Sequence, residues 1–218
     1  MDSRCDYKLV LSALLCHRGI RQRREDARKT NLMLQGLARL ILRVGGWTPV
    51  GGLPDVPKAL IIAAPHTSNW DGIWALVYKV AIDAEIHFFA KKSLFWFPLS
   101  SLLRWLGGIP LDRERAGSAV KQAINMFKAE ERLYFGLAPE GTRTKKPGWK
   151  SGFYRIAEGA NVPVYLGFLD FENKRVGIGP RFDLTGDQDA DLTRIGDFYS
   201  GIRGRHPEKT SPVRFIVK

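Results

Sequence analysis

Short apolar blocks with two different spacings alternate along the chain. Continuous apolar runs bounded by glycine, proline or polar residues are typical of buried β-strands, whereas apolar residues at every third or fourth position are typical of helices. Strands are expected at 59–65, 85–91, 108–112, 132–139, 162–171 and 174–182, with a terminal edge strand at 213–217. Helices are expected at 71–83, 97–107, 118–131, 152–160 and 190–202. This alternation predicts an α/β fold: a single domain with a central mixed, mostly parallel sheet flanked by helices.

The residues before the first strand divide into two parts. Residues 1–31 contain the basic run HRGIRQRREDARK and are interpreted as a basic N-terminal tail, separate from a domain at residues 32–218. The next segment has apolar residues at helical spacing, which predicts an amphipathic helix that ends at Gly45-Gly46. Its apolar stripe consists of Met33, Leu34, Leu37, Leu40, Ile41 and Val44. This helix would either pack on the core or lie on a membrane with its arginines toward the headgroups.

The charge of the chain favours a polyanionic partner. Lys and Arg total 34 and Asp and Glu total 22, which gives a net charge of +12. Such an excess is typical of proteins that bind nucleic acid, an anionic membrane surface or phosphorylated substrates. Because the sequence has no recognition helix, zinc knuckle or RNP-like strand, we expect no nucleic-acid partner. The two cysteines, Cys5 and Cys16, form no disulfide framework and fit a reducing cytoplasm.

An aromatic-rich segment begins at Ser93 with the sequence SLFWFPLSSLLRWLGGIPL. Pro98, Arg104 and Pro110 interrupt it, whereas a membrane-spanning helix needs about 20 mostly apolar residues, so we expect no transmembrane helix here. Tryptophan and phenylalanine beside cations are typical of a membrane interface. We therefore expect peripheral attachment to an anionic membrane surface, on the cytoplasmic face of the plasma (inner) membrane. The alternative is that these aromatic residues pack against the sheet as core.

His66 and Asp71 lie where a buried strand passes into a helix, in the stretch APHTSNWDG. Catalytic groups favour this end of the strands in α/β sheets, and the polar TSN sequence favours a turn that brings the two side chains together. A carboxylate on one imidazole nitrogen leaves the other nitrogen as a base for an alcohol. Two alternatives remain open: His66 is a loop histidine, and Asp71 forms a helix-capping box with Ser68. No third ligand stands at metal-binding spacing, so no metal is expected.

Three further stretches carry weaker signals. Arg113 follows the strand at 108–112, where a guanidinium can take a phosphate with two hydrogen bonds or pair with a neighbouring acid. The sequence PEGTR follows the strand at 132–139, and its Glu140 stands among several cations. These cations are Arg143, Lys145, Lys146 and Lys150. Pro163 opens an apolar strand, where its missing N–H is harmless.

Taken together and in this order, the four stretches resemble the motifs of the glycerophospholipid acyltransferase family. The first family motif, H-x-x-x-x-D, matches His66 and Asp71, and the second, an arginine after a strand, matches Arg113. The third, P-E-G-T-R, matches Pro139, Glu140, Gly141, Thr142 and Arg143. The fourth, an apolar strand opened by V-P, matches Val162, Pro163 and Val164. Ala138 and Thr144 depart from the phenylalanine and serine that are more common in the family, and the second proline of the fourth motif is missing.

The resemblance implies that residues 32–218 form an acyltransferase domain. It would transfer a fatty acyl group from an acyl-CoA or acyl-carrier-protein thioester to the hydroxyl of a lysoglycerophospholipid, with 1-acylglycerol-3-phosphate as the expected acceptor. His66 would be the general base and Asp71 its orienting partner, with no metal or prosthetic cofactor. Backbone N–H groups of the TSN turn would stabilise the oxyanion.

For the substrate contacts, the resemblance places Arg113 and Arg143 on the acceptor phosphate and Glu140 on the glycerol or the arginines. It also places Gly141 and Thr142 in the acceptor site and Pro163 on the acyl-donor side. Two other functions remain open from the sequence. One is a non-catalytic basic module that binds membranes or lipids, and the other is a thioester hydrolase that uses the same His/Asp pair.

Overall fold

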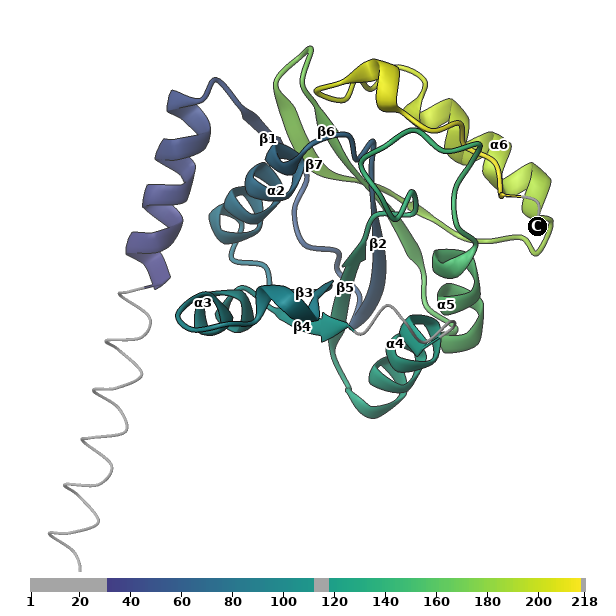
Figure 1. Cartoon of the computed structure of the whole chain (residues 1–218), viewed down its shortest axis with the longest axis horizontal. Coiled ribbons are helices and arrows are strands. Elements are labelled where there is room, and N and C mark those ends of the chain that lie inside the picture. The colour runs from purple at the N-terminus through teal and green to yellow at the C-terminus, as the bar shows by residue number, and fades with distance from the viewer. Residues whose placement is uncertain (1–30, 112–117, 217–218) are drawn as a thin grey trace, which may run out of the picture.

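A computed structural model describes residues 31–111 and 118–216 of the chain. Its centre is a seven-stranded sheet in the order β1-β7-β6-β2-β5-β3-β4 (Figure 1). The strands are β1 (Thr48–Val50), β2 (Lys58–Ala64), β3 (Ile86–Lys91), β4 (Gly108–Leu111), β5 (Leu133–Leu137), β6 (Val164–Asp170) and β7 (Arg175–Phe182). Neighbouring strands are parallel except for β6 and β7, which are antiparallel. The predicted mixed, mostly parallel sheet is confirmed.

Helices cover both faces of this sheet, as predicted. The α-helices after residue 44 are α2 (Asn69–Ala81), α3 (Leu99–Trp105), α4 (Ser118–Ala129), α5 (Gly152–Ala160) and α6 (Gln188–Tyr199). Two short 3-10 helices, η1 (Lys92–Leu94) and η2 (Pro207–Lys209), complete the list. Helices α4, α5 and α6 pack on one face, while α2 and the helix at 31–44 pack on the other. No helix among the described residues is both long enough and apolar enough to cross a membrane.

The apolar run of β2 follows from its place at the centre of the sheet. Side chains alternate between faces along a strand, so Leu60 and Ile62 point toward α4–α6 while Ala59 and Ile61 point toward α2. All four are buried because both faces are covered. Strand β2 pairs in parallel with both β5 and β6. The residues that follow these three strands therefore meet along the edge of the sheet that is formed by the carboxyl ends of the strands.

Two strand predictions need correction. Residues 213–216 do not form an edge strand, because they make only an isolated bridge between Trp149 and Phe215 while β1 and β4 form the sheet edges. Their backbone bonds to Trp149 instead, where Arg214 C=O accepts from Trp149 N–H at 2.7 Å. The short edge strand β1 was missed, since three residues that include Pro49 carry no strand pattern.

The helix at 31–44 ends at Gly45-Gly46 as predicted, but its orientation was not foreseen. Ala38 and Leu42 are its buried residues, and Arg39 Nε donates to Ala81 C=O at 3.0 Å at the end of α2. Most of the predicted stripe is exposed: Met33, Leu37, Leu40, Ile41 and Val44, with Leu32 beside them. The stripe therefore does not pack on the described core. Most of the predicted basic tail, residues 1–30, lies outside the described residues.

Candidate active site

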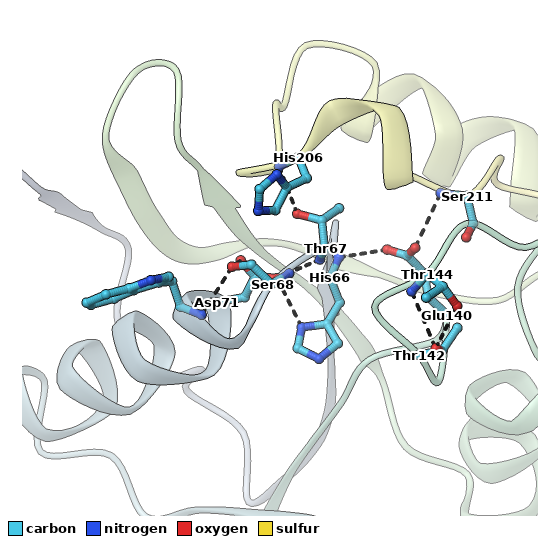
Figure 2. Close-up of polar contacts among 10 residues, drawn as sticks. His66, Thr67, Ser68, Asp71, Glu140, Thr142, Thr144, His206 and Ser211 are labelled. Carbon is cyan, nitrogen blue, oxygen red and sulfur yellow. Dashed lines mark hydrogen bonds and ion pairs between the residues drawn. The ribbon is translucent and has the colours of Figure 1, made fainter.

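His66 and Asp71 meet at the edge of the sheet where β2 ends (Figure 2). Nδ1 of His66 lies 3.2 Å from Oδ2 of Asp71. The aspartate side chain is 1% exposed, whereas the imidazole is 28% exposed. The predicted turn therefore brings the two groups together, with the carboxylate buried and the ring open to the surroundings.

Asp71 also caps helix α2, so the capping interpretation holds alongside the pairing with His66. Ser68 is the N-cap residue, and its Oγ accepts from Trp70 N–H at 3.1 Å and donates to Asp71 Oδ1 at 2.9 Å. Asp71 Oδ2 accepts from the backbone N–H groups of Thr67 at 2.6 Å and Ser68 at 2.8 Å. The two backbone bonds to Oδ2 fix the carboxylate oxygen that faces His66.

The balance of burial and hydrogen bonding keeps Asp71 ionised. Burial raises the pKa of this carboxyl, but hydrogen bonds from His66 and Ser68 outweigh burial and bring the pKa below its usual value. A carboxylate held on Nδ1 fixes the tautomer of the imidazole and leaves Nε2 as a proton acceptor. The pair can therefore take a proton from a hydroxyl group without a serine or cysteine nucleophile.

The backbone of the TSN turn does not match the expected oxyanion site. The Thr67 and Ser68 N–H groups both donate to Asp71, and the His66 N–H donates to Glu140 Oε1 at 2.7 Å. These donors are used to hold the site together. The expectation that they would face an oxyanion is wrong for these three groups.

Glu140 lies behind His66 and is 1% exposed. Its Oε1 accepts from the His66 N–H, and its Oε2 accepts from the Ser211 N–H at 3.3 Å. Burial raises the pKa of this carboxyl, and the bonds from His66 and Ser211 only partly offset that effect. This carboxyl therefore binds backbone groups, in contrast to the expected contact with the acceptor glycerol or the arginines.

The rest of the PEGTR loop turns sharply next to Glu140. Gly141 has a φ of 64°, a left-handed conformation that glycine adopts without strain, and its N–H donates to Ala138 C=O at 3.1 Å. The Thr142 hydroxyl is 3.1 Å from that of Thr144, and Arg143 is exposed. The loop thus presents its cation to solvent at the same edge of the sheet as His66.

The other two predicted site residues are not brought to His66 by the described structure. Arg113 lies outside the described residues. Pro163 precedes β6 and accepts from Leu60 N–H at 3.0 Å, whereas Ala64, near His66, pairs with Phe168 farther along β6. Pro163 is therefore at the opposite end of the strand from His66. No group of three His, Cys, Asp or Glu side chains among residues 31–111 and 118–216 is arranged to hold a metal ion.

An apolar cavity of about 280 Å³ opens beside His66 and Asp71, between α2 and the sheet. Several residues on both walls of this cavity, close to His66 and Asp71 in the sequence or across the sheet, are small. They are Gly72 and Ala75 on α2, with Ala63, Gly136, Ala138 and Gly167 on the sheet side. Tyr78 and Lys79 line it farther along α2, and Lys79 Nζ donates to Leu106 C=O at 2.8 Å. The spacing from Asp71 to Lys79 corresponds to about 12 Å along a helix.

Ser211 and His206 belong to the site network although no sequence motif singles them out. The His206 N–H donates to Thr67 Oγ1 at 3.2 Å, and Ser211 contacts Glu140 as described above. Both contact Thr67 and Glu140 through backbone N–H groups, which a sequence motif does not reveal. Thr67 itself lay within the TSN stretch but was assigned only to the turn.

Comparisons with known proteins identify relatives of this chain. Over 117 residues the chain is 37% identical to a 1-acyl-sn-glycerol-3-phosphate acyltransferase of Haemophilus influenzae. The matched segment covers 50% of this chain and 47% of that protein. The chain thus spans about half the length of that relative. The fold is similar to the crystal structure of the 1-acyl-sn-glycerophosphate (LPA) acyltransferase PlsC from Thermotoga maritima. That similarity has a TM-score of 0.57 at 19% identity and covers 80% of this chain and 79% of the other.

The sequence model of the Acyltransferase family matches residues 50–165. This range contains the His66–Asp71 pair, Glu140 and the small residues on the cavity walls up to Gly136 and Ala138. Because the match covers more than half of the chain and includes the paired residues, the chain belongs to the Acyltransferase family.

Proposed function

We propose that this chain transfers a fatty acyl group from an acyl-CoA or acyl-carrier-protein thioester to the free hydroxyl of 1-acylglycerol-3-phosphate, a reaction of phospholipid biosynthesis. The observation that carries this proposal is the buried Asp71 carboxylate on His66 Nδ1, at the mouth of an apolar cavity. Membership of the Acyltransferase family and the name of the Haemophilus influenzae relative support the reaction class and the acceptor.

In the proposed reaction, His66 Nε2 takes the proton of the acceptor hydroxyl as its oxygen attacks the thioester carbonyl. The C–S bond then breaks, the acyl group forms an ester with the acceptor, and the proton on His66 passes to the leaving thiolate. Asp71 stabilises the imidazolium that forms between these two proton transfers. The orienting hydrogen bonds on Asp71 are already present, so little reorganisation is needed during the reaction.

The cavity beside the pair is proposed to receive the acyl chain of the donor. Its walls are mostly apolar, and His66 and Asp71 themselves line it. An alkyl chain in this space would be removed from water, at about 0.8 kcal/mol of favourable transfer free energy per buried methylene. The thioester carbonyl would then lie at the cavity mouth, next to the base.

The acceptor phosphate is proposed to bind Arg143 and Arg113. Arg143 is exposed in the loop that follows β5, at the same sheet edge as His66. A guanidinium can hold a phosphate with two parallel hydrogen bonds. Arg113 enters this proposal from its place in the sequence, two residues after the end of β4.

We further propose that the protein works as a peripheral protein on an anionic membrane, at the cytoplasmic face of the plasma (inner) membrane. Two exposed groups of large apolar residues support this. One is the stripe of the helix at 31–44 already described, and the other consists of Leu94, Trp96, Phe97, Leu102 and Trp105. The C-terminal part of helix α2 is bonded to both regions. Arg39, on the helix at 31–44, donates to Ala81 C=O, and Lys79 donates to the C=O of Leu106, directly after α3.

The test is a product assay with purified protein, a panel of lysoglycerophospholipids, and both acyl-CoA and acyl-carrier-protein donors. We expect a diacyl product from 1-acylglycerol-3-phosphate and a loss of turnover of roughly 10²–10⁴-fold in His66→Ala. Free fatty acid without diacyl product would indicate a thioester hydrolase. Lipid binding without any product, unchanged in His66→Ala, would indicate a non-catalytic module and would contradict the proposal.

A further inference from the structure

The chain after α6 returns across the two loops that carry the active-site residues. We call residues 203–215 the C-terminal strap; Figure 2 shows it as the yellow ribbon above Thr67 and Glu140. It begins at Arg203, whose C=O accepts from Phe171 N–H at 2.8 Å, and ends at Phe215, which bridges to Trp149. The strap lies outside the residues that match the Acyltransferase family model, so the family match assigns it no role.

The first contact of the strap with the site is through Thr67, the residue directly after His66. Thr67 is 1% exposed, and its Oγ1 accepts from the His206 N–H at 3.2 Å. The Thr67 N–H donates to Asp71 Oδ2 at 2.6 Å. A single residue thus connects the strap with the carboxylate that faces the His66 ring.

The strap packs on this loop at a glycine. A Cβ atom on Gly204 would lie 2.9 Å from Thr67 Oγ1, 3.0 Å from Thr67 Cγ2 and 3.1 Å from Pro65 Cγ. Pro65 and Thr67 are the two residues on either side of His66. The absence of a side chain at Gly204 therefore allows the strap to support the backbone on both sides of His66.

The second contact reaches His66 through Glu140. The carboxyl accepts from the His66 N–H with one oxygen and from the Ser211 N–H with the other. Ser211 is buried, and its Oγ accepts from Lys146 N–H at 3.1 Å, which ties the strap to the loop after Glu140. His66 is consequently held on one side through Thr67 and on the other through Glu140.

We propose that the C-terminal strap is a positioning element of the active site, with Thr67 and Gly204 as positioning residues that fix His66 relative to Asp71. This inference rests on the proposed function, in which His66 is the general base. The strap contributes no residue to the lining of the apolar cavity, and Arg143 lies in a different loop. Loosening the strap should therefore lower kcat and leave the KM of both substrates near the wild-type values.

The first pair of variants is Gly204→Ala with Gly201→Ala as its matched control. The added methyl at position 204 meets Thr67 and Pro65, whereas a Cβ at Gly201 has nothing within 4 Å. We expect Gly204→Ala to lower kcat by roughly 10-fold to 100-fold, the scale of a misplaced catalytic group, with KM unchanged. Gly201→Ala should have wild-type kcat and KM.

The second pair is Thr67→Val and Thr67→Ser. Valine keeps the shape but removes the oxygen that accepts from His206, while serine keeps that oxygen. We expect a lower kcat in Thr67→Val and recovery toward wild type in Thr67→Ser, with KM for donor and acceptor unchanged in both. Activities are compared per folded molecule, at a temperature below the melting transition of each variant.

The inference is overturned if Gly204→Ala and Thr67→Val are folded and keep wild-type kcat, or if they lose only thermal stability. It is also overturned if KM rises in place of the fall in kcat. A His66→Ala protein assayed in parallel distinguishes a failure of the proposed function from a failure of the strap inference. If His66→Ala remains active, the proposed function fails, whereas an inactive His66→Ala beside fully active strap variants rejects the strap alone. If Gly204→Ala does not fold, the Thr67 pair decides.

Discussion

The Oδ2 atom of Asp71 lies 3.2 Å from Nδ1 of His66 and accepts two backbone N–H groups of the turn between them. The same carboxylate is the third helical residue of the α2 capping box. Capping a helix and orienting a base usually involve separate groups. Here the cap is what holds the carboxylate in place, so the start of α2 and the geometry of the pair depend on each other.

Replacing Asp71 with Asn tests this double role. The amide oxygen can keep the bonds from Thr67 and Ser68, which places the amide nitrogen toward Ser68 and leaves the His66 ring near a neutral oxygen. Turnover should fall by roughly 100-fold or more, since the imidazolium loses its counter-charge. Stability should fall only by about 0.3–1 kcal/mol, because the backbone bonds remain and only the negative charge near the start of α2 is lost. Steady-state kinetics and thermal melts measure both, and a variant with near-normal turnover would contradict the pairing.

Ser68→Ala is the matched variant that affects the cap alone. It removes the hydroxyl that bonds to Trp70 N–H and Asp71 Oδ1, but it leaves Asp71 Oδ2 and its contact with His66. We expect about 1 kcal/mol lower stability and turnover close to wild type. Equal losses of activity in Ser68→Ala and Asp71→Asn would mean that the cap, and no separate effect on the imidazole, limits the reaction.

The buried carboxyl of Glu140 should make stability fall as the pH rises. Its pKa is raised above the usual 4.5 by burial, so between 4.5 and the folded pKa the folded protein holds a proton that the unfolded chain has lost. In that window stability decreases with increasing pH. Glu140→Gln should remove this slope, although it also weakens the contact with Ser211. Melting temperatures from pH 4 upward, with exposed Glu158→Gln as control, provide the measurement. Parallel curves for wild type and Glu140→Gln would contradict the inferred shift.

Much of the fold was predictable because its signals are local. The run at 59–65 and the helical spacing after Asp71 predicted β2 and α2, since burial on both faces of a strand and on one face of a helix leaves a periodic pattern. The pair His66 and Asp71 was predictable for the same reason, because only a short turn separates them. The isolated bridge at Phe215 was mistaken for a strand, since an apolar run does not reveal whether a neighbouring strand edge is available.

The parts of the site that escaped prediction depend on contacts between distant residues. Glu140 was selected from its motif, but its bond to the His66 backbone follows from the pairing of β2 with β5, and its bond to Ser211 follows from the path of the chain after α6. The exposed stripe at 31–44 is a similar case. Helical spacing identified the apolar stripe, but the side that packs on the protein is set by Ala38 and Leu42, which fit against the end of α2.

The proposed acyl-chain cavity predicts a change in donor selectivity when it is partly filled. Gly72 lines the cavity, and a Cβ there has nothing within 4 Å, so a side chain can be added at this position without a clash at its first carbon. Gly72→Leu should raise the KM for long-chain thioesters more than for short ones. Gly72→Ala adds only one methyl and should change selectivity much less. Kinetics with thioesters of graded length test this, and an unchanged preference in Gly72→Leu would place the chain elsewhere.

Arg143 should affect the acceptor more than the donor. Arg143→Ala is expected to raise the KM for 1-acylglycerol-3-phosphate, and Arg143→Lys should restore it only in part, because an ammonium cannot make the planar two-bond contact. The same outcome is expected at Arg113. Exposed Arg155→Ala on α5 controls for the loss of one positive charge. An equal rise in KM for both substrates would assign Arg143 to the donor or to the loop itself.

The last prediction concerns the aromatic segment between β3 and β4. Trp96 is 59% exposed and Phe97 is 85% exposed, so these two rings are not core residues of the described protein. Lys91 and Lys92, which are also exposed, precede these rings by a few residues in the sequence. Tryptophan and phenylalanine next to lysines are typical of residues that enter the interfacial region of a bilayer.

Trp96→Ser/Phe97→Ser should therefore remain folded and lose much of its binding to vesicles, on neutral and anionic lipid alike. Lys91→Gln/Lys92→Gln should lose binding mainly on anionic vesicles, because each lysine near such a surface contributes about 1 kcal/mol. Added salt should release the wild-type protein only in part, since screening weakens the lysine contacts but not the burial of the rings. Co-sedimentation with vesicles of both kinds gives the measurement. If the aromatic double variant is folded and binds like wild type, this segment is not the membrane contact, and the exposed stripe at 31–44 becomes the surface to alter next.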